Sequence, residues 1–363
     1  MMRMKYVADW VARRIVNRQA GAARVGALQV VTWAVAAIVA ASGCSSDSAP
    51  SLEAEQVGFE ASRTPLGSPP WQPFVRASVW NLRLPASRPE TPLPAEGLAV
   101  APFAVSDGDY GIKVYFASAT DPMWEVTFDD YNSVSDNFFP ISPVALRAPA
   151  VLVPPSGTDG TVIIVDENRQ YAYELWRFAV QGGGSVPQGH TASLNITDLR
   201  SDGIHRNVGV TAAGLPGLGG VLRGLEVQAG QPIRHKLWLA VHPSLLHAAA
   251  VWPANHFDVP GDGAHAAVRY GEVIALSQSY DIKQGECGLS PLFQRLAQGL
   301  QDFGGIVQDR GGDSIGLVTE IGAVSSRLDT DEAAMFGQLA CLRKYLVRVD
   351  DPWTGAQPGG LGY

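Results

Sequence analysis

The pattern of hydrophobic and polar positions changes near residue 71, and from there it predicts a protein built mainly of strands. Short apolar runs recur, and Pro, Gly and Asp separate them. Alternating or short continuous apolar runs bounded by such residues are typical of β-strands. Two of these runs flank a polar turn and form a predicted hairpin. The strongest strand candidates are residues 111–117, 123–128, 161–165, 171–180, 233–241, 272–280 and 305–308.

Two segments in the C-terminal third have helical periodicity instead. The first begins at Ser290, a favoured N-cap residue, and ends before Gly304. The second begins near Asp329 in a capping-box arrangement. Together, the strands and helices predict an all-β fold, a jelly-roll-like β-sandwich with two short helices, over residues 71–350. A loose Gly/Pro-rich tail is expected at residues 351–363.

The start of the chain carries the pattern of an export signal. An apolar stretch from Val25 to Ala40 follows six basic residues and leads through small residues to Cys44. This arrangement predicts a bacterial lipoprotein signal over residues 1–43, after which the lipidated Cys44 would anchor the protein in a membrane. Residues 44–70 would be a flexible tether, and the protein would lie in the cell envelope, on the outer membrane or cell surface. An uncleaved transmembrane anchor is the alternative.

The charge of the exported chain restricts its partners. Removing the signal leaves 21 Lys+Arg against 34 Asp+Glu, so the formal charge moves from −8 for the whole chain to −13. Nucleic-acid binding depends on Lys and Arg against phosphate, so no nucleic-acid partner is predicted. An anionic polysaccharide would also be repelled unless a local basic pocket received it.

Two cysteines, Cys287 and Cys341, remain after Cys44. In an oxidising compartment they are candidates for an intrachain disulfide, with two buried free thiols as the alternative. They are too few for a zinc knuckle, and no metal site or cofactor is predicted. A G-x-S-x-G match at residues 312–316 does not indicate a hydrolase elbow, because no histidine follows it.

Candidate chemistry begins in the strand predicted at residues 171–180, where alternation places Glu174 and Trp176 on one face. A carboxylate beside aromatic rings suits a sugar site, since rings stack on the sugar and the acid moves a proton. A salt-bridged glutamate at the rim of a sheet is the alternative. His235 is expected on an apolar strand face, either as a hydrogen-bonded core residue or as a general acid or base at a cleft.

The other candidates are polar or aromatic residues in turns and at strand ends. They are Arg223, Glu226, Trp252, Asn255, His256, Asp281 and Asp309. The first two follow a glycine-rich segment. The next three share one turn, which either lines a cleft or fills the core with its tryptophan. The two aspartates follow apolar runs, where cleft residues often lie.

Several short motifs occur in an order that resembles that of a known family. They are Tyr173-Glu174-Leu175, residues 213–223 with Glu226, Ile233-Arg234-His235, Val251-Trp252-Pro253 with His256, Ser279-Tyr280-Asp281-Ile282, and residues 303–307 with Asp309. Over residues 78–349 the chain is similar to a largely uncharacterised family of secreted bacterial proteins. The resemblance implies a jelly-roll β-sandwich that acts on polysaccharide. The chain departs from the family pattern at Gly224-Leu225, Asn255 and Arg310, so a divergent binding protein is the alternative.

These residues support two main functional hypotheses. The first is a surface-tethered enzyme acting on polysaccharide or envelope glycan. A hydrolase would use Glu174 and Glu226 as its carboxylate pair. A lyase would use His235 or His256 as its base, with Arg223 neutralising a uronate. The substrate-binding candidates are Trp176, Arg223, Trp252, Asn255, Asp281 and Asp309.

The second hypothesis is a non-catalytic lipoprotein that binds glycan or a surface partner. In that case Trp176 and Trp252 would stack on the ligand, and the acids would be rim residues. A purely structural envelope protein without a cleft is a third interpretation.

Overall fold

The computed structural model describes residues 72–129, 134–135, 140–182, 185–204, 209–227, 231–325, 332–355 and 357–358. The predicted signal, the lipidation site at Cys44, the tether, and the start of the second predicted helix near Asp329 lie outside these residues. Within the described residues the chain is mostly strands in mixed sheets with a few short helices, which confirms the all-β prediction. Among the same residues, no helix combines the length and apolar character needed to cross a membrane.

The largest sheet has seven strands and mixes parallel with antiparallel pairs. Its order is β2 (Glu90–Pro92), β19 (Leu346–Val349), β16 (Val273–Leu276), β17 (Gly305–Arg310), β13 (Leu237–Val241), β18 (Ile315–Val318) and β3 (Phe103–Ser106). β13 runs parallel to β17 and β18 runs parallel to β3, whereas the other neighbours are antiparallel. This sheet therefore joins strands that are far apart in the sequence.

Two further sheets and two strand pairs complete the β-structure. The five-stranded sheet has the order β4 (Lys113–Phe116), β8 (Val162–Val165), β9 (Tyr171–Trp176), β12 (Ser193–Asp198) and β6 (Val134–Ser135). The four-stranded sheet has the order β10 (Ala179–Gln181), β11 (Gln188–Thr191), β5 (Met123–Phe128) and β7 (Val144–Arg147). The pairs are β1 (Leu82–Arg83) with β20 (Gln357–Pro358) and β14 (Leu246–Ala250) with β15 (Val268–Tyr270).

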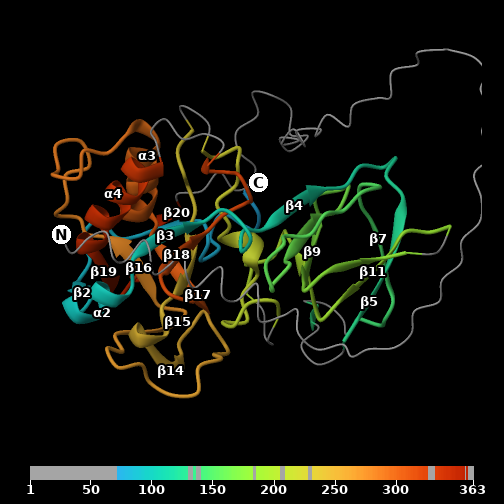
Figure 1. The fold of residues 1–363 in the computed structure, drawn as a ribbon, viewed down its shortest axis with the longest axis horizontal. Coiled ribbons are helices and arrows are strands. Elements are labelled where there is room, and N and C mark those ends of the chain that lie inside the picture. The colour runs from blue at the N-terminus through green and yellow to red at the C-terminus, as the bar shows by residue number, and fades with distance from the viewer. Residues whose placement is uncertain are drawn as a thin grey trace, which may run out of the picture. The chain divides into compact units, whose positions relative to one another are not determined.

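Figure 1 shows the seven-stranded sheet on the left and the other two large sheets on the right. The predicted hairpin is present as the antiparallel pair β8–β9.

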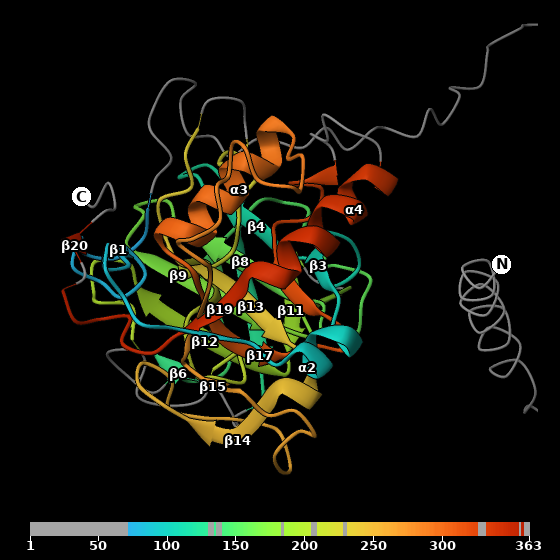
Figure 2. The same ribbon diagram turned by 90° about the vertical axis from the view of Figure 1, so that its left-hand side faces the viewer.

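Short helices cover one face of the seven-stranded sheet (Figure 2). They are α2 (Ala95–Val100), α3 (Pro291–Asp302) and α4 (Glu332–Leu342). The chain also has the 3₁₀ turns η1 (Gly217–Gly219), η2 (Pro243–Leu245) and η4 (Arg343–Tyr345). The two longer helices, α3 and α4, lie in the C-terminal third, where the sequence predicts two. Ser290 precedes α3 as expected, but its hydroxyl makes no capping hydrogen bond. A disulfide joins Cys287, before α3, to Cys341 in α4.

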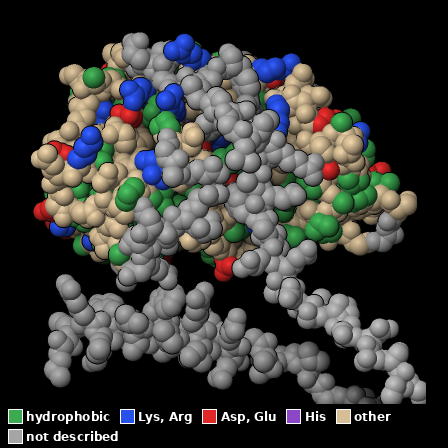
Figure 3. Space-filling view, turned by 90° about the horizontal axis from the view of Figure 1, so that it is seen from above, with side chains coloured by type: hydrophobic (Ala, Val, Ile, Leu, Met, Phe, Trp, Pro, Cys, Tyr) green, Lys and Arg blue, Asp and Glu red, His purple; other side chains and the backbone are tan. Residues whose placement is uncertain are grey.

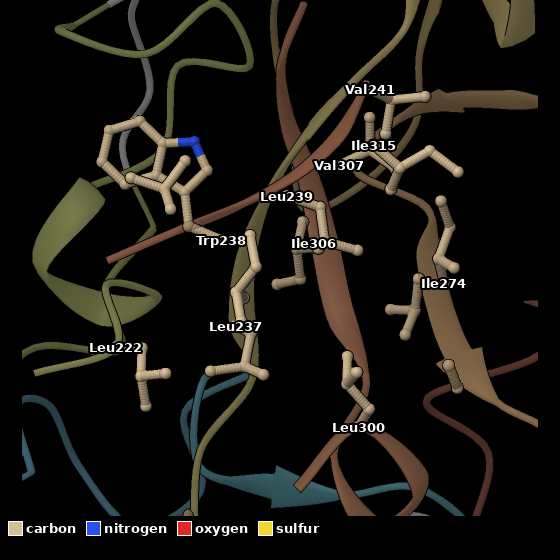
Figure 4. Packing of buried hydrophobic residues seen from close by; sticks show 14 of the residues in the cluster. Leu222, Leu237, Trp238, Leu239, Val241, Ile274, Leu300, Ile306, Val307 and Ile315 are labelled. Carbon is tan, nitrogen blue, oxygen red and sulfur yellow. The ribbon is translucent and has the colours of Figure 1, made fainter. Parts of the chain in front are cut away.

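Two apolar cores lie on the two faces of the five-stranded sheet. Ile163 and Ala172 belong to the larger core, which the seven-stranded sheet and α3 share. Ile164 and Leu175 face the opposite way, into a smaller core under the four-stranded sheet. This arrangement follows from strand alternation, because β8 and β9 carry apolar residues on both faces. Figure 4 shows the larger core, with Trp238 of β13 pointing toward η1.

Three predicted strands are shorter than the sequence pattern indicates. β9 ends at Trp176 because Arg177 adopts a positive φ of 55°, which breaks the alternation. Phe178 therefore packs in the smaller core rather than on the face of Glu174. β13 begins at Leu237, so the placement of His235 on that strand's apolar face is wrong. β16 covers only residues 273–276 of the predicted 272–280.

Candidate functional site

Glu174 on β9 is completely buried, and its carboxylate holds part of the fold together. The Gly217 N–H donates to Oε2 at 2.9 Å, and the Leu218 N–H donates to Oε1 at 2.8 Å. The Asn195 Nδ2 also donates to Oε2, at 3.2 Å. A buried carboxylate needs such partners, and here they fix η1 against β9. The Glu174 side chain is closed to solvent. The sequence analysis predicted a sugar beside this carboxylate, but in the structure the carboxylate binds η1.

The glycines of η1 are required by close packing against aromatic rings. A Cβ at Gly217 would lie 2.4 Å from the Trp238 ring, and one at Gly219 would lie 2.5 Å from the Trp80 ring. Real Cβ atoms do not approach other atoms this closely. The glycine-rich segment is therefore a packing device, and its backbone N–H groups bind the protein's own Glu174.

Arg223, Glu226 and His235 form one buried cluster of charged side chains. The Arg223 Nε and Nη2 atoms donate to Glu226 Oε2 and Oε1 at 3.1 Å and 2.8 Å. The His235 Nε2 lies 2.9 Å from Glu226 Oε1, although the pair lacks the alignment of a good hydrogen bond. All three side chains are at least nine-tenths buried. The sequence candidates do converge here, but their functional groups contact one another.

The geometry of this cluster defines its charges. The His235 Nδ1 lies 2.7 Å from the Lys236 carbonyl oxygen, which can only accept, so Nδ1 carries a proton. Burial by itself would raise the pKa of Glu226, but the charges of Arg223 and His235 outweigh it and hold that pKa below its usual range.

Glu320 borders this cluster without joining its ion pairs. Its Oε2 accepts from the Gly224 N–H at 2.8 Å. Burial is the main cause that raises the pKa of Glu320 to about 7, and the charge of Glu226 adds to it. Glu320 is half-buried and so meets solvent, whereas Glu226 is buried.

The turn that carries Trp252 is pinned at both ends. The Val251 N–H donates to the Tyr270 carbonyl oxygen at 2.9 Å. The Asn255 N–H donates to the Ala213 carbonyl oxygen at 3.0 Å. The His256 Nδ1 donates to the Ala212 carbonyl oxygen at 3.0 Å. The carbonyl oxygens of Ala212 and Ala213 therefore bind the C-terminal end of this turn.

Asp309 at the end of β17 joins the same region, because its Oδ1 accepts from the Ala212 N–H at 2.6 Å. Burial is the main cause that raises the pKa of Asp309 to about 8, and the charges of Asp258 and Asp159 add to it. Asp258 in turn accepts a 2.5 Å hydrogen bond from the Tyr270 hydroxyl. These surroundings therefore favour the protonated form of Asp309.

Aromatic side chains flank this region on two sides. Trp252 is 55% exposed, and its ring meets Trp353 edge to face with a centroid distance of 5.1 Å. Trp176 lies at the other side, with its Nε1 3.4 Å from Asp159 Oδ1 and the Arg177 guanidinium 4.2 Å from its ring centroid. Asp159 thus connects Trp176 to the neighbourhood of Asp309.

Asp281 lies apart from all of these groups. It is exposed, and its Oδ1 accepts from the N–H groups of Lys283 and Gln284 at 2.9 Å and 3.0 Å. These contacts make Asp281 the cap of a local turn.

Lys236 is a buried cation that the sequence did not indicate. Its Nζ donates to the carbonyl oxygens of Leu82 and Phe303 at 2.8 Å and 3.0 Å, and lies 5.1 Å from the Trp353 ring centroid. Burial, together with a smaller contribution from the charge of Arg88, lowers the pKa of Lys236 to about 7. Lysine side chains are usually solvent-exposed, so only the tertiary structure reveals this buried one.

The structure therefore divides the predicted site into separate places. Arg223, Glu226 and His235 are together in one buried cluster. Asn255, His256 and Asp309 contact Ala212 or Ala213, Trp252 belongs to the same turn, and Trp176 is linked to the region through Asp159. Glu174 and Asp281 belong to neither group. Asp258, Tyr270 and Trp353 are neighbours that sequence reasoning missed, because nothing local links them to the turn.

Across the part of the chain that the structure describes, no group of three or more His, Cys, Asp and Glu residues is placed to hold a metal ion. Comparison with known proteins adds no assignment: no family model matches the chain, and neither a curated protein nor a solved structure matches it. The resemblance carried by the short motifs stays a prediction.

Proposed function

We propose that this protein is a lipid-anchored, jelly-roll-like protein of the bacterial envelope that binds glycan without cleaving it. The observation that carries the proposal is the Trp252 turn. A tryptophan that is 55% exposed is held on a turn fixed by backbone hydrogen bonds to Tyr270 and Ala213. Preorganised aromatic rings bind sugars well, because stacking then costs little side-chain entropy.

Neighbouring groups suit the polar edge of a sugar. Asn255 and Asp258 are exposed beside Trp252, and they supply hydrogen-bond donors and acceptors. Trp353 supports the Trp252 ring from the side. The hydrolase pair expected from the sequence gives less support to an enzyme, because Glu174 and Glu226 are both closed to solvent.

The test is binding of the full-length protein, purified in detergent, to a panel of neutral polysaccharides. Trp252→Ala should weaken binding by about tenfold or more, in line with the loss of a central aromatic contact. Tyr110→Ala is the matched control, because Tyr110 is an aromatic residue with the same 55% exposure at another place. Equal binding by the Trp252 variant and the native protein would remove the proposed surface.

A second candidate function is favoured by Asp309. Burial raises the pKa of Asp309, and the carboxyl group of Asp258 lies close enough to add to that shift, so the two resemble the carboxyl pair of a glycosidase. Incubation of the same polysaccharides with the protein, read by mass spectrometry, distinguishes the two functions. Products with an added water that disappear in Asp309→Asn would establish hydrolysis, whereas retention without products supports binding.

A further inference from the structure

A pocket of about 680 Å³ opens beside α3, on a different part of the surface from Asp309. Its wall is contributed by β1, by the segment that leads into β13, and by the last turns of α3. The lining residues are Arg83, Pro232, Ile233, Arg234, Arg295, Gln298, Asp302 and Phe303. Three arginines and one aspartate leave two positive charges in the lining of a protein whose formal net charge is −8.

The three arginines differ in how the protein uses them. Arg83 pairs with Asp302, and its guanidinium lies 5.5 Å from the Phe303 ring centroid. Arg295 donates from Nη1 to the Pro291 carbonyl oxygen at 3.2 Å and from Nη2 to the Val227 carbonyl oxygen at 3.0 Å. No carboxylate within the described residues neutralises Arg295, and its Nε is buried without a partner.

Arg234 is the guanidinium that remains available. Its backbone carbonyl accepts from Gln72 Nε2 at 2.6 Å, which fixes the main chain, but the side chain has no polar partner among the described residues. It is half-buried, so its charge meets both the pocket and solvent. A guanidinium without an anion, on a main chain that is held in place, can bind an oxyanion through two parallel hydrogen bonds.

The surroundings of the pocket extend this preference. Figure 3 shows several Lys and Arg side chains on the face of the molecule that is seen from above. Charges are screened beyond roughly 10 Å in physiological salt. A ligand in the pocket is therefore affected more by the arginines of the lining than by distant acidic residues. Pro232, Ile233 and Phe303 add an apolar wall against which the carbon ring of a sugar can pack.

We propose that this pocket binds the oxyanion of an acidic sugar, a uronate carboxylate or a sulfate ester, with Arg234 and Arg295 as its ligands. The inference rests on the proposed glycan-binding function for its polymer context. Lys236 lies between the two sites, since its Nζ is 3.0 Å from the Phe303 carbonyl oxygen and 5.1 Å from the Trp353 ring centroid. The pocket would thus bind an acidic sugar of a glycan, and the Trp252 turn would bind a neutral sugar nearby.

The experiment is titration of the full-length protein in detergent with glucuronate, glucose 6-sulfate and glucose. Glucuronate or the sulfate ester should bind more tightly than glucose, and raising the salt concentration from 50 to 500 mM should weaken only the anionic sugars. Arg234→Ala should weaken the anionic sugar by about tenfold, the expected loss for a charged hydrogen-bonding group. Which anion binds better identifies the carboxylate or the sulfate as the natural group.

Arg200→Ala is the matched control, because Arg200 is a surface arginine engaged with Asp198 outside the pocket. An unchanged melting temperature shows that Arg234→Ala is folded, and the salt dependence of the native protein tests the pocket without any substitution. Equal affinity for glucuronate, the sulfate ester and glucose, an absence of binding, or an unaffected Arg234 variant would overturn the proposal.

The two proposals fail separately. Loss of neutral-polysaccharide binding in Trp252→Ala, with retained glucuronate binding, supports both sites. If Trp252→Ala changes nothing while Arg234→Ala abolishes glucuronate binding, the pocket stands and the proposed function of the Trp252 turn falls.

Discussion

Replacing Glu174 with glutamine should destabilise the protein, even though glutamine has almost the same shape. The two backbone donors go to different oxygens, Gly217 N–H to Oε2 and Leu218 N–H to Oε1. A glutamine has one carbonyl oxygen and one amino group, so in either orientation a backbone N–H faces another donor. The substitution therefore leaves at least one buried N–H group unpaired and removes the negative charge from the other contacts.

The magnitude follows from those contacts. A hydrogen bond to a charged group contributes about 1.5–3 kcal/mol, and an unpaired buried donor costs a similar amount. We therefore expect Glu174→Gln to lower the free energy of unfolding by about 3 kcal/mol, a large part of the stability of a typical protein. The Gly217 and Leu218 amides should also exchange their hydrogens faster, because η1 loses its anchor.

The assay is denaturant unfolding of the full-length protein, followed by tryptophan fluorescence and by circular dichroism. Glu125→Gln is the control, since Glu125 is exposed on β5 and its substitution should change stability by less than about 0.5 kcal/mol. If Glu174→Gln unfolds at the same denaturant concentration as the native protein, the carboxylate does not hold η1. Its loss of a sugar-processing activity with unchanged stability would return Glu174 to the catalytic hypothesis.

Three further predictions follow from packing, cross-linking and burial. Gly217→Ala should lower the unfolding free energy by a few kcal/mol, because its Cβ would lie 2.4 Å from the Trp238 ring; thermal unfolding beside Gly312→Ala, where nothing crowds the Cβ, checks this. Replacing Cys287 and Cys341 by serine should cost about 4 kcal/mol, the entropy estimate for a cross-link spanning 54 residues; an equal denaturation midpoint for the native protein with and without reductant would contradict it. Because burial lowers the pKa of Lys236 to about 7 from 10.5, the unfolded state binds more protons between those values, so stability should rise with pH across that window. Lys236→Met should remove this rise, and urea titrations of both proteins from pH 7 to pH 10 measure the difference.

Local pattern predicted the elements whose identity depends on near neighbours. β5 was expected at residues 123–128 and is found there, because alternation, flanking turn residues and strand propensity agree. α3 begins at Pro291, directly after Ser290, as the sequence predicts. The boundaries that failed are set by tertiary structure: β9 stops where Arg177 turns the chain, which no periodicity reveals.

The candidate site could be predicted only in part. The sequence marked Glu174 as a candidate, but its partners at Gly217 and Leu218 are more than forty residues away in the chain. The sequence pattern around Glu174 therefore cannot distinguish a structural carboxylate from a catalytic one. The proposed pocket could not be predicted from the sequence for the same reason. Arg83, Arg234 and Arg295 are far apart in the chain, and they meet only because β1 and α3 both pack beside the entrance to β13.

The position of η1 has a consequence for how the protein unfolds. Glu174 of the five-stranded sheet binds the backbone of η1, while Trp238 of the seven-stranded sheet packs on its glycines. One three-residue turn is thus shared by both sheets, and the core that contains it includes side chains from each. If the two sheets separated, each would expose its apolar face, and the buried carboxylate of Glu174 would lose its hydrogen bonds to η1. The two halves seen in the ribbon should therefore melt in a single cooperative transition, as one unit of stability.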